Sequence, residues 1–134
     1  MVIENKRYQL LLADDDPAFR QTLRDILAPF FQLLEASSGE EAVDIIGRQR
    51  VDIALLDMHM YTLTGLQTLR VLKSVNSVAP GILITADASD ALRNEEDVFS
   101  VLAKPVSKLD LVSTVSTALE DAYEDPDALT PPTA

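Results

Sequence analysis

Five polar residues of this chain stand at the ends of short apolar runs, where their side chains could do chemistry together. They are Asp14, Asp15, Asp57, Thr85 and Lys104. Two like charges about 4 Å apart repel by roughly 4 kcal/mol at an effective dielectric of 20, so clustered carboxylates need a proton or a cation. Mg²⁺ binds few protein carboxylates and often takes a phosphate oxygen as well. The aspartates therefore predict a Mg²⁺ site.

Lys104 adds a positive charge that two acids and a metal ion do not require. This charge is explained if a second anion, such as a phosphoryl group, reaches the site. A carboxylate can attack phosphorus and form an aspartyl-phosphate, while a metal ion and a lysine stabilise the transferring oxygens. The Thr85 hydroxyl can donate a hydrogen bond to one of these oxygens. The residue types thus indicate phosphoryl transfer to an aspartate.

A third aspartate, Asp16, follows the first two and precedes Pro17. Proline suits the first position of a helix, and aspartate is a preferred residue just before it. A carboxylate there also complements the helix dipole. We therefore expect Asp16 to cap a helix and leave Asp14 and Asp15 to the cation.

The composition limits the classes of function. The chain has 134 residues, no cysteine and one histidine, which rules out disulfides and a Cys/His zinc site. A net charge of −11 disfavours binding to nucleic acid or an anionic membrane. No apolar run reaches the ~20 residues of a membrane span, and the first residues lack a secretory signal pattern. We expect a soluble, cytoplasmic protein.

The elements that must position these residues alternate between two kinds. Short apolar runs predict five strands, at residues 10–13, 33–34, 53–56, 82–84 and 98–102. Helical patterns predict five helices. The first has its apolar face at residues 19–30 and should be ended or distorted by Pro29, and the second is capped by Ser37 or Ser38. The third follows Gly65, a short polar one lies near residues 89–97, and a long last one runs through residues 111–122. This alternation predicts an α/β fold with a mostly parallel sheet covered by helices on both faces.

The predicted domain covers residues 1–123. After Tyr123 the composition becomes acidic and proline-containing, without periodicity, so residues 124–134 are interpreted as a tail or the start of a linker.

Four segments, in this order, resemble the receiver domain of two-component response regulators, the CheY-like superfamily. They are LLADDDPAFRQTL, ALLDMHMYTLTGLQTL, ILITA and LAKP. The resemblance covers about residues 8–122 and implies a flavodoxin-like (βα)5 three-layer sandwich with strand order 2-1-3-4-5. It also implies a signalling domain rather than an enzyme.

The resemblance assigns roles to the candidate residues. It implies that Asp57 accepts a phosphoryl group from a sensor histidine kinase or a histidine phosphotransfer protein. Mg²⁺ would be held by Asp14, Asp15, Asp57 and the backbone carbonyl of His59. Thr85 and Lys104 would contact the phosphoryl group, and the change would pass to a downstream effector domain or protein. The Lys104–Pro105 bond is expected to be cis.

Two positions and one stretch depart from the family pattern. Tyr61 replaces a common proline, and Val101 replaces an aromatic residue whose ring changes rotamer. The stretch between Thr85 and Lys104 is also short, which predicts a truncated fourth helix. That face often forms the family's output or dimer surface, so weak self-association stays open.

Two alternatives belong to other classes. An Asp-nucleophile Mg²⁺-dependent phosphohydrolase would usually carry a second Asp two residues after the nucleophile, where this chain has His59. A receiver-like adaptor would keep the fold without being phosphorylated. The His59 side chain, with Asp87, is placed to influence hydrolysis of the phosphoryl group, although an exposed loop histidine without a catalytic role is the simpler interpretation.

Overall fold

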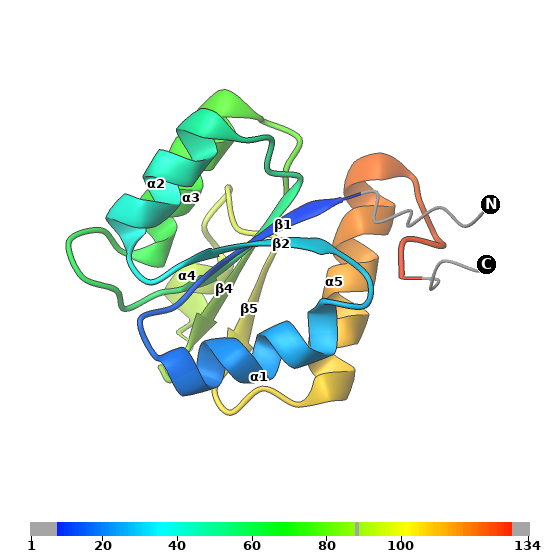
Figure 1. Cartoon of the computed structure of the whole chain (residues 1–134), viewed down its shortest axis with the longest axis horizontal. Coiled ribbons are helices and arrows are strands. Elements are labelled where there is room, and N and C mark those ends of the chain that lie inside the picture. The colour runs from blue at the N-terminus through cyan, green and yellow to red at the C-terminus, as the bar shows by residue number, and fades with distance from the viewer. Residues whose placement is uncertain (1–7, 88, 130–134) are drawn as a thin grey trace.

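The computed structural model describes residues 8–87 and 89–129, so parts of the N-terminal segment and of the predicted tail lie outside it. Five strands alternate with five helices along the chain (Figure 1). Their bounds are β1 Gln9–Ala13, α1 Pro17–Leu27, β2 Gln32–Ala36, α2 Gly39–Arg48, β3 Ile53–Asp57, α3 Gly65–Val75, β4 Gly81–Thr85, α4 Asp90–Arg93, β5 Ser100–Ala103 and α5 Lys108–Tyr123. The strands pair in parallel in the order β2-β1-β3-β4-β5, which confirms the expected topology.

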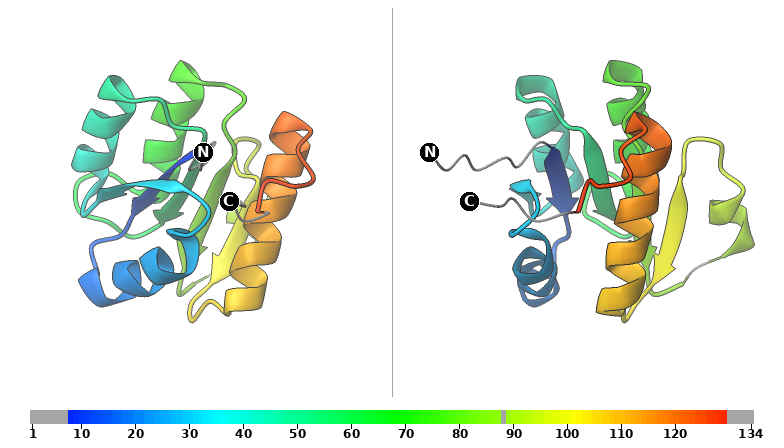
Figure 2. Two further views of the ribbon diagram at one scale, coloured as in Figure 1. Left: turned by 45° about the vertical axis from the view of Figure 1, so that its right-hand side comes forward. Right: turned by 90° about the vertical axis from the view of Figure 1, so that its right-hand side faces the viewer.

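Helices cover both faces of the sheet, which makes three layers (Figure 2). On one face, alternate strand residues such as Leu12 and Leu55 pack with α1 and α5. On the other face, their neighbours Leu11 and Leu56 pack with α2 and α3. All five residues of β3 are buried, because both of its faces carry helices. This central strand therefore holds its last residue, Asp57, in a rigid position.

The helix starts follow the sequence closely. The Asp16 carboxylate accepts hydrogen bonds from the backbone N–H groups of Ala18 (3.0 Å) and Phe19 (3.3 Å), and Pro17 is the first residue of α1. The expected helix cap is thus confirmed. Of the two serines considered for α2, Ser38 is the cap.

The region before β5 is less regular than the sequence pattern suggested. The helix expected near residues 89–97 is limited to Asp90–Arg93, in agreement with the predicted truncation. Backbone hydrogen bonds from Glu95 N–H to Leu92 O and from Val98 N–H to Glu95 O form consecutive turns. Because these turns include Val98, the strand begins at Ser100 rather than at residue 98 as expected from the apolar run.

The chain continues to pack after α5. Glu124 has a left-handed backbone (φ 53°) that ends the helix, and Ala128 is only 8% exposed. Ala128 and Leu129 belong to the apolar core beside α1 and α5. Residues 124–129 therefore lie against the domain, and residues 130–134 of the predicted tail are outside the described part. Within the described residues, no helix is long and apolar enough to cross a membrane.

Candidate functional site

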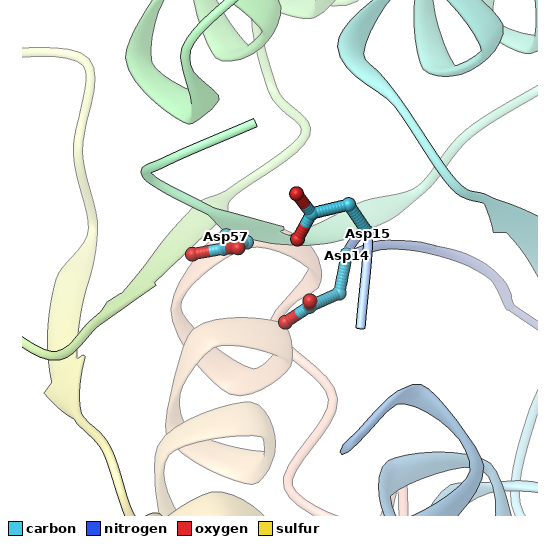
Figure 3. Close-up of side chains that lie close together, drawn as sticks. All are labelled: Asp14, Asp15 and Asp57. Carbon is cyan, nitrogen blue, oxygen red and sulfur yellow. The ribbon is translucent and has the colours of Figure 1, made fainter. Parts of the chain in front are cut away.

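Three carboxylates meet at the ends of β1 and β3. The two strands are neighbours, with Ala13 in register with Leu56, so the residues that follow them reach the same edge of the sheet. Asp14, Asp15 and Asp57 each place a carboxylate oxygen within 4.8 Å of the others, and Figure 3 shows the side chains gathered there. The structure thus brings together the three side chains predicted to hold the metal.

The three acids differ in exposure and in partners. Asp14 is 1% exposed, Asp57 is 6% exposed, and Asp15 lies in solvent. The Asp14 carboxylate accepts a hydrogen bond from the backbone N–H of Asp16 at 2.8 Å. The Asp57 carboxylate accepts a longer one, 3.3 Å, from the backbone N–H of His59. Asp14 and Asp57 are therefore shielded from water, whereas Asp15 lies on the solvent side of the cluster.

Lys104 is the cation that contacts these carboxylates within the described chain. Its Nζ lies 3.1 Å from Asp14 Oδ2 and 3.7 Å from Asp57 Oδ1. The backbone N–H of Lys104 donates to Thr85 O at 2.9 Å, which ties the residue after β5 to the end of β4, and the Lys104–Pro105 bond is cis, as expected. One ammonium among three carboxylates leaves the site short of positive charge.

Burial and the neighbouring acids both act on the pKa of Asp57. Burial, followed by the neighbouring charge of Asp14, raises the pKa of the Asp57 carboxyl above its ordinary value. Lys104 and the His59 N–H act in the opposite direction without cancelling the rise. A divalent cation would remove the same electrostatic penalty. The donor set consists of carboxylate oxygens, which suits a hard cation such as Mg²⁺.

Thr85 ends β4 and is fully buried. Its Oγ1 accepts a hydrogen bond from the backbone N–H of Asp87 at 3.1 Å. The hydroxyl proton is not used in that bond, so it can be donated to another group. Thr85 therefore keeps a proton for the predicted hydrogen bond to a phosphoryl oxygen.

The loop after Asp57 starts tightly and then becomes exposed. A Cβ on Gly65 would lie 2.5 Å from Asp57 O, so only glycine lets α3 begin this close to Asp57. His59 is exposed, and the coordinating role expected for its backbone carbonyl stays a prediction. Tyr61, at the family's proline position, is 80% exposed. Thr62 has a φ of 70°.

Val101 takes part in the hydrophobic core. It is 3% exposed, lies opposite Leu83 in the sheet and packs on the face of α2 and α3. A buried valine in a strand has no ring to turn outwards. The side chain at this position is therefore held in the interior.

Two contacts of α1 with the site did not follow from sequence patterns. Phe19 lies in the first turn of α1, and Lys104 Nζ lies 4.4 Å from the centroid of its ring. Arg20 follows Phe19, and its Nη1 donates to Asp14 O at 2.6 Å. Both residues lie about one helical turn after the acids, which places them near the site. Their contacts with Lys104 and with the backbone of Asp14 became visible only in the folded structure.

Comparison with known proteins agrees with this geometry. The family model for the response regulator receiver domain matches residues 10–116. The transcriptional regulatory protein GlrR of Escherichia coli (strain K12) is 32% identical over 124 residues, covering 90% of this chain and 28% of GlrR. The chain therefore spans little more than a quarter of this relative.

Solved structures show the same fold. A CheY-like receiver domain protein from Methanospirillum hungatei JF-1 has a TM-score of 0.81 at 20% identity, covering 88% of this chain and 98% of that one. TrrA from Thermotoga maritima, solved in complex with Mg²⁺-BeF, has a TM-score of 0.74 at 24% identity, covering 84% and 99%. This chain belongs to the response regulator receiver domain family, whose members are signalling domains rather than enzymes.

Proposed function

We propose that this domain accepts a phosphoryl group on Asp57 in a Mg²⁺-dependent reaction and thereby switches its interactions. The observation that carries the proposal is the meeting of Asp14, Asp15 and Asp57 within 4.8 Å, with the ammonium of Lys104 against two of them. Such a cluster is unfavourable in the resting protein, because three carboxylates meet one ammonium. A divalent cation would balance this charge, and the cation and Lys104 would then attract the anionic phosphoryl group.

The donor in this proposal is a phosphohistidine of a sensor histidine kinase or of a histidine phosphotransfer protein. An Asp57 carboxylate oxygen attacks phosphorus and forms an O–P bond while the N–P bond to the donor imidazole breaks. The imidazole leaves with the electron pair and takes up a proton from water. Lys104 neutralises charge on the phosphoryl oxygens, and the Thr85 hydroxyl donates to one of them.

Asp14, Asp15, Asp57 and the carbonyl of His59 would hold Mg²⁺. The bound ion would supply positive charge to the transferring oxygens. The complex of TrrA with Mg²⁺-BeF supports this part by family likeness. Asp14 also binds Lys104, so it links the metal side of the site to the side that faces the phosphoryl group.

The setting of this reaction is part of the proposal. We place the domain in the cytoplasm, where it would pass its state to a downstream effector domain or protein. We set its boundary near residue 123 and take the following residues as a tail or linker whose first part, residues 124–129, packs back on the domain. The partial coverage of GlrR is consistent with a receiver that works beside other domains. The family match speaks against the phosphohydrolase alternative.

The test is incubation with acetyl phosphate and Mg²⁺ followed by mass spectrometry of the intact protein. We expect a gain of one phosphoryl group that is absent in Asp57→Asn. Asp15→Asn should weaken Mg²⁺ binding by at least tenfold, whereas Asp16→Ala should lower stability and leave Mg²⁺ binding within twofold, because Asp16 caps α1. Failure of the wild-type protein to gain mass while it binds Mg²⁺ would contradict the proposal and favour the non-phosphorylated adaptor.

A further inference from the structure

The ammonium of Lys104 has a third neighbour besides the two carboxylates. The ring of Phe19 lies with its centroid 4.4 Å from Nζ, well inside the ~6 Å range of a cation–π interaction. Phe19 comes from the first turn of α1, whereas Lys104 follows β5, so the contact joins distant parts of the chain. The lysine side chain is 23% exposed, and such contacts strengthen as water is removed.

Packing alone does not account for this arrangement. Phe19 is partly buried and touches the core beside α1 and α5, so its apolar role is real. Cores usually tolerate other large apolar side chains, such as leucine or methionine, in such a role. An aromatic ring adds a negative π face, and here an ammonium lies against it.

The ring differs from the other two partners of Lys104 in one respect. Asp14 and Asp57 are charged groups that would change partners when a cation binds and when Asp57 is modified. Phe19 is neutral, so it neither competes for the cation nor adds negative charge. Because the ring is uncharged, its attraction for an ammonium at a given distance does not depend on the charges of the neighbouring groups.

We propose that Phe19 is a positioning residue for Lys104, holding the ammonium beside Asp57 so that it is in place when the phosphoryl group arrives. This inference rests on the proposed function of Asp57. The next residue along α1, Arg20, donates to Asp14 O, so the first turn of this helix supports the site at two points. Removing the ring should leave Asp14 and Asp57 in place and increase the mobility of the Lys104 ammonium.

The contact can be observed without phosphorylation. In the metal-free protein, the ring current of Phe19 should shift the NMR signals of the Lys104 ε-methylene group, and Phe19→Leu should return them to ordinary values. Phe19→Tyr should keep the shift. Lysine signals that do not respond to Phe19→Leu would overturn the inference, whether or not Asp57 is phosphorylated.

The functional effect is tested by the rate of phosphorylation with acetyl phosphate at saturating Mg²⁺. We expect Phe19→Leu to slow the reaction about three- to tenfold, with the Mg²⁺ dissociation constant within twofold of wild type. Phe19→Tyr should retain the rate, and replacement of the ring by its pentafluoro analogue, which reverses the charge of the π face, should slow it like leucine.

A double-mutant cycle separates positioning from packing. In a Lys104→Ala background, Phe19→Leu should have no further effect, because no ammonium remains to be held. The matched control is Phe30→Leu, a partly buried phenylalanine of the same core beyond the end of α1, which should leave the rate unchanged. Equal slowing by Phe19→Leu with and without Lys104 would overturn the inference. A wild-type protein that is never phosphorylated would instead overturn the proposed function.

Discussion

Strand β3 has an aspartate at each end, and the carboxylates of the two differ in how completely they are paired. Asp52 precedes the strand and Asp57 is its last residue, and both are buried. The Asp52 carboxylate accepts hydrogen bonds from the Gln9 backbone N–H (2.8 Å) and from Arg50 Nε (3.1 Å). The Asp57 carboxylate has a 3.3 Å hydrogen bond and an ammonium at 3.7 Å, and it faces two further acids.

The surroundings of the two aspartates continue this contrast. Around Asp52, the Tyr123 hydroxyl donates to its backbone carbonyl at 2.7 Å, and the ring of Tyr123 stacks on Tyr8 with centroids 5.3 Å apart. Around Asp57, carboxylates outnumber the ammonium of Lys104. A buried charge that is fully paired holds the fold together, whereas one left short of partners is available for binding and chemistry. Two aspartates of similar burial can therefore be distinguished by their partners.

The largest expected effect comes from breaking the paired end. Asp52→Ala should lower the free energy of unfolding by about 2.5 kcal/mol, because it leaves the part-buried N–H of Gln9 without its acceptor and removes the ion pair of the exposed Arg50. Urea denaturation followed by circular dichroism measures this loss. Asp44→Ala, which removes an exposed i,i+4 ion pair with Arg48 on α2, is the control and should change stability by less than about 0.5 kcal/mol. A loss below about 1 kcal/mol for Asp52→Ala would contradict the comparison.

Truncation after α5 tests whether the contacts of residues 125–129 with the domain contribute to its stability. Deleting residues 125–134 removes the hydrogen bond from the Tyr8 hydroxyl to Asp125 (2.7 Å) and the packing of Ala128 and Leu129. We expect a loss of about 2 kcal/mol, roughly half from apolar burial. Deleting only residues 130–134 keeps these contacts and should cost less than about 0.5 kcal/mol in the same denaturation experiment. Equal stability of the two truncated proteins would show that residues 125–129 add nothing.

Substitution at the other end of β3 is expected to increase stability rather than reduce it. In Mg²⁺-free buffer at neutral pH, Asp57→Asn should raise the free energy of unfolding by about 1 kcal/mol, or the melting temperature by about 4 °C, because it relieves repulsion with Asp14 and Asp15. Thermal unfolding of the two proteins side by side measures it. A decrease in stability would show that the cluster is balanced in the resting protein.

The same substitution has a defined pH dependence. The fold raises the pKa of Asp57, so the folded protein holds this proton more tightly than the unfolded chain. The stability from Asp57 is therefore fully present below its ordinary pKa of 3.8 and is lost as the pH rises through the higher folded value. The advantage of Asp57→Asn should grow from near zero in acid to its full size at neutral pH.

The features that could be predicted from the sequence are those that depend on local patterns, and the features that could not be predicted depend on contacts between distant residues. Strand cores, the Asp16 cap and the gathering of Asp14, Asp15 and Asp57 depend on local patterns and on the rule that parallel strands end at one edge. The pairing of Asp52 with Gln9 and the contact of Phe19 with Lys104 depend on residues 43 and 85 positions apart, which no local pattern specifies. The start of β5 was misplaced for a different reason, because local turns that the apolar run does not reveal include Val98.

The smallest effect concerns backbone strain beside Asp57. Thr62 has a φ of 70°, and the Leu63 N–H donates to Tyr61 O at 2.8 Å, which closes a three-residue turn around it. A β-branched residue is unfavourable at a positive φ, whereas asparagine is found there several times more often than most residues. Thr62→Asn should therefore raise the free energy of unfolding by about 0.5 kcal/mol, measured by urea denaturation.

The control for this prediction is a threonine with ordinary backbone angles. Thr22 is exposed on α1, where the backbone is helical, so Thr22→Asn should give no gain. If both substitutions shift stability equally, the effect belongs to the asparagine and not to the turn. If only Thr62→Asn stabilises, then strain as well as unbalanced charge is concentrated at the Asp57 end of β3, while the Asp52 end is the relaxed and paired one.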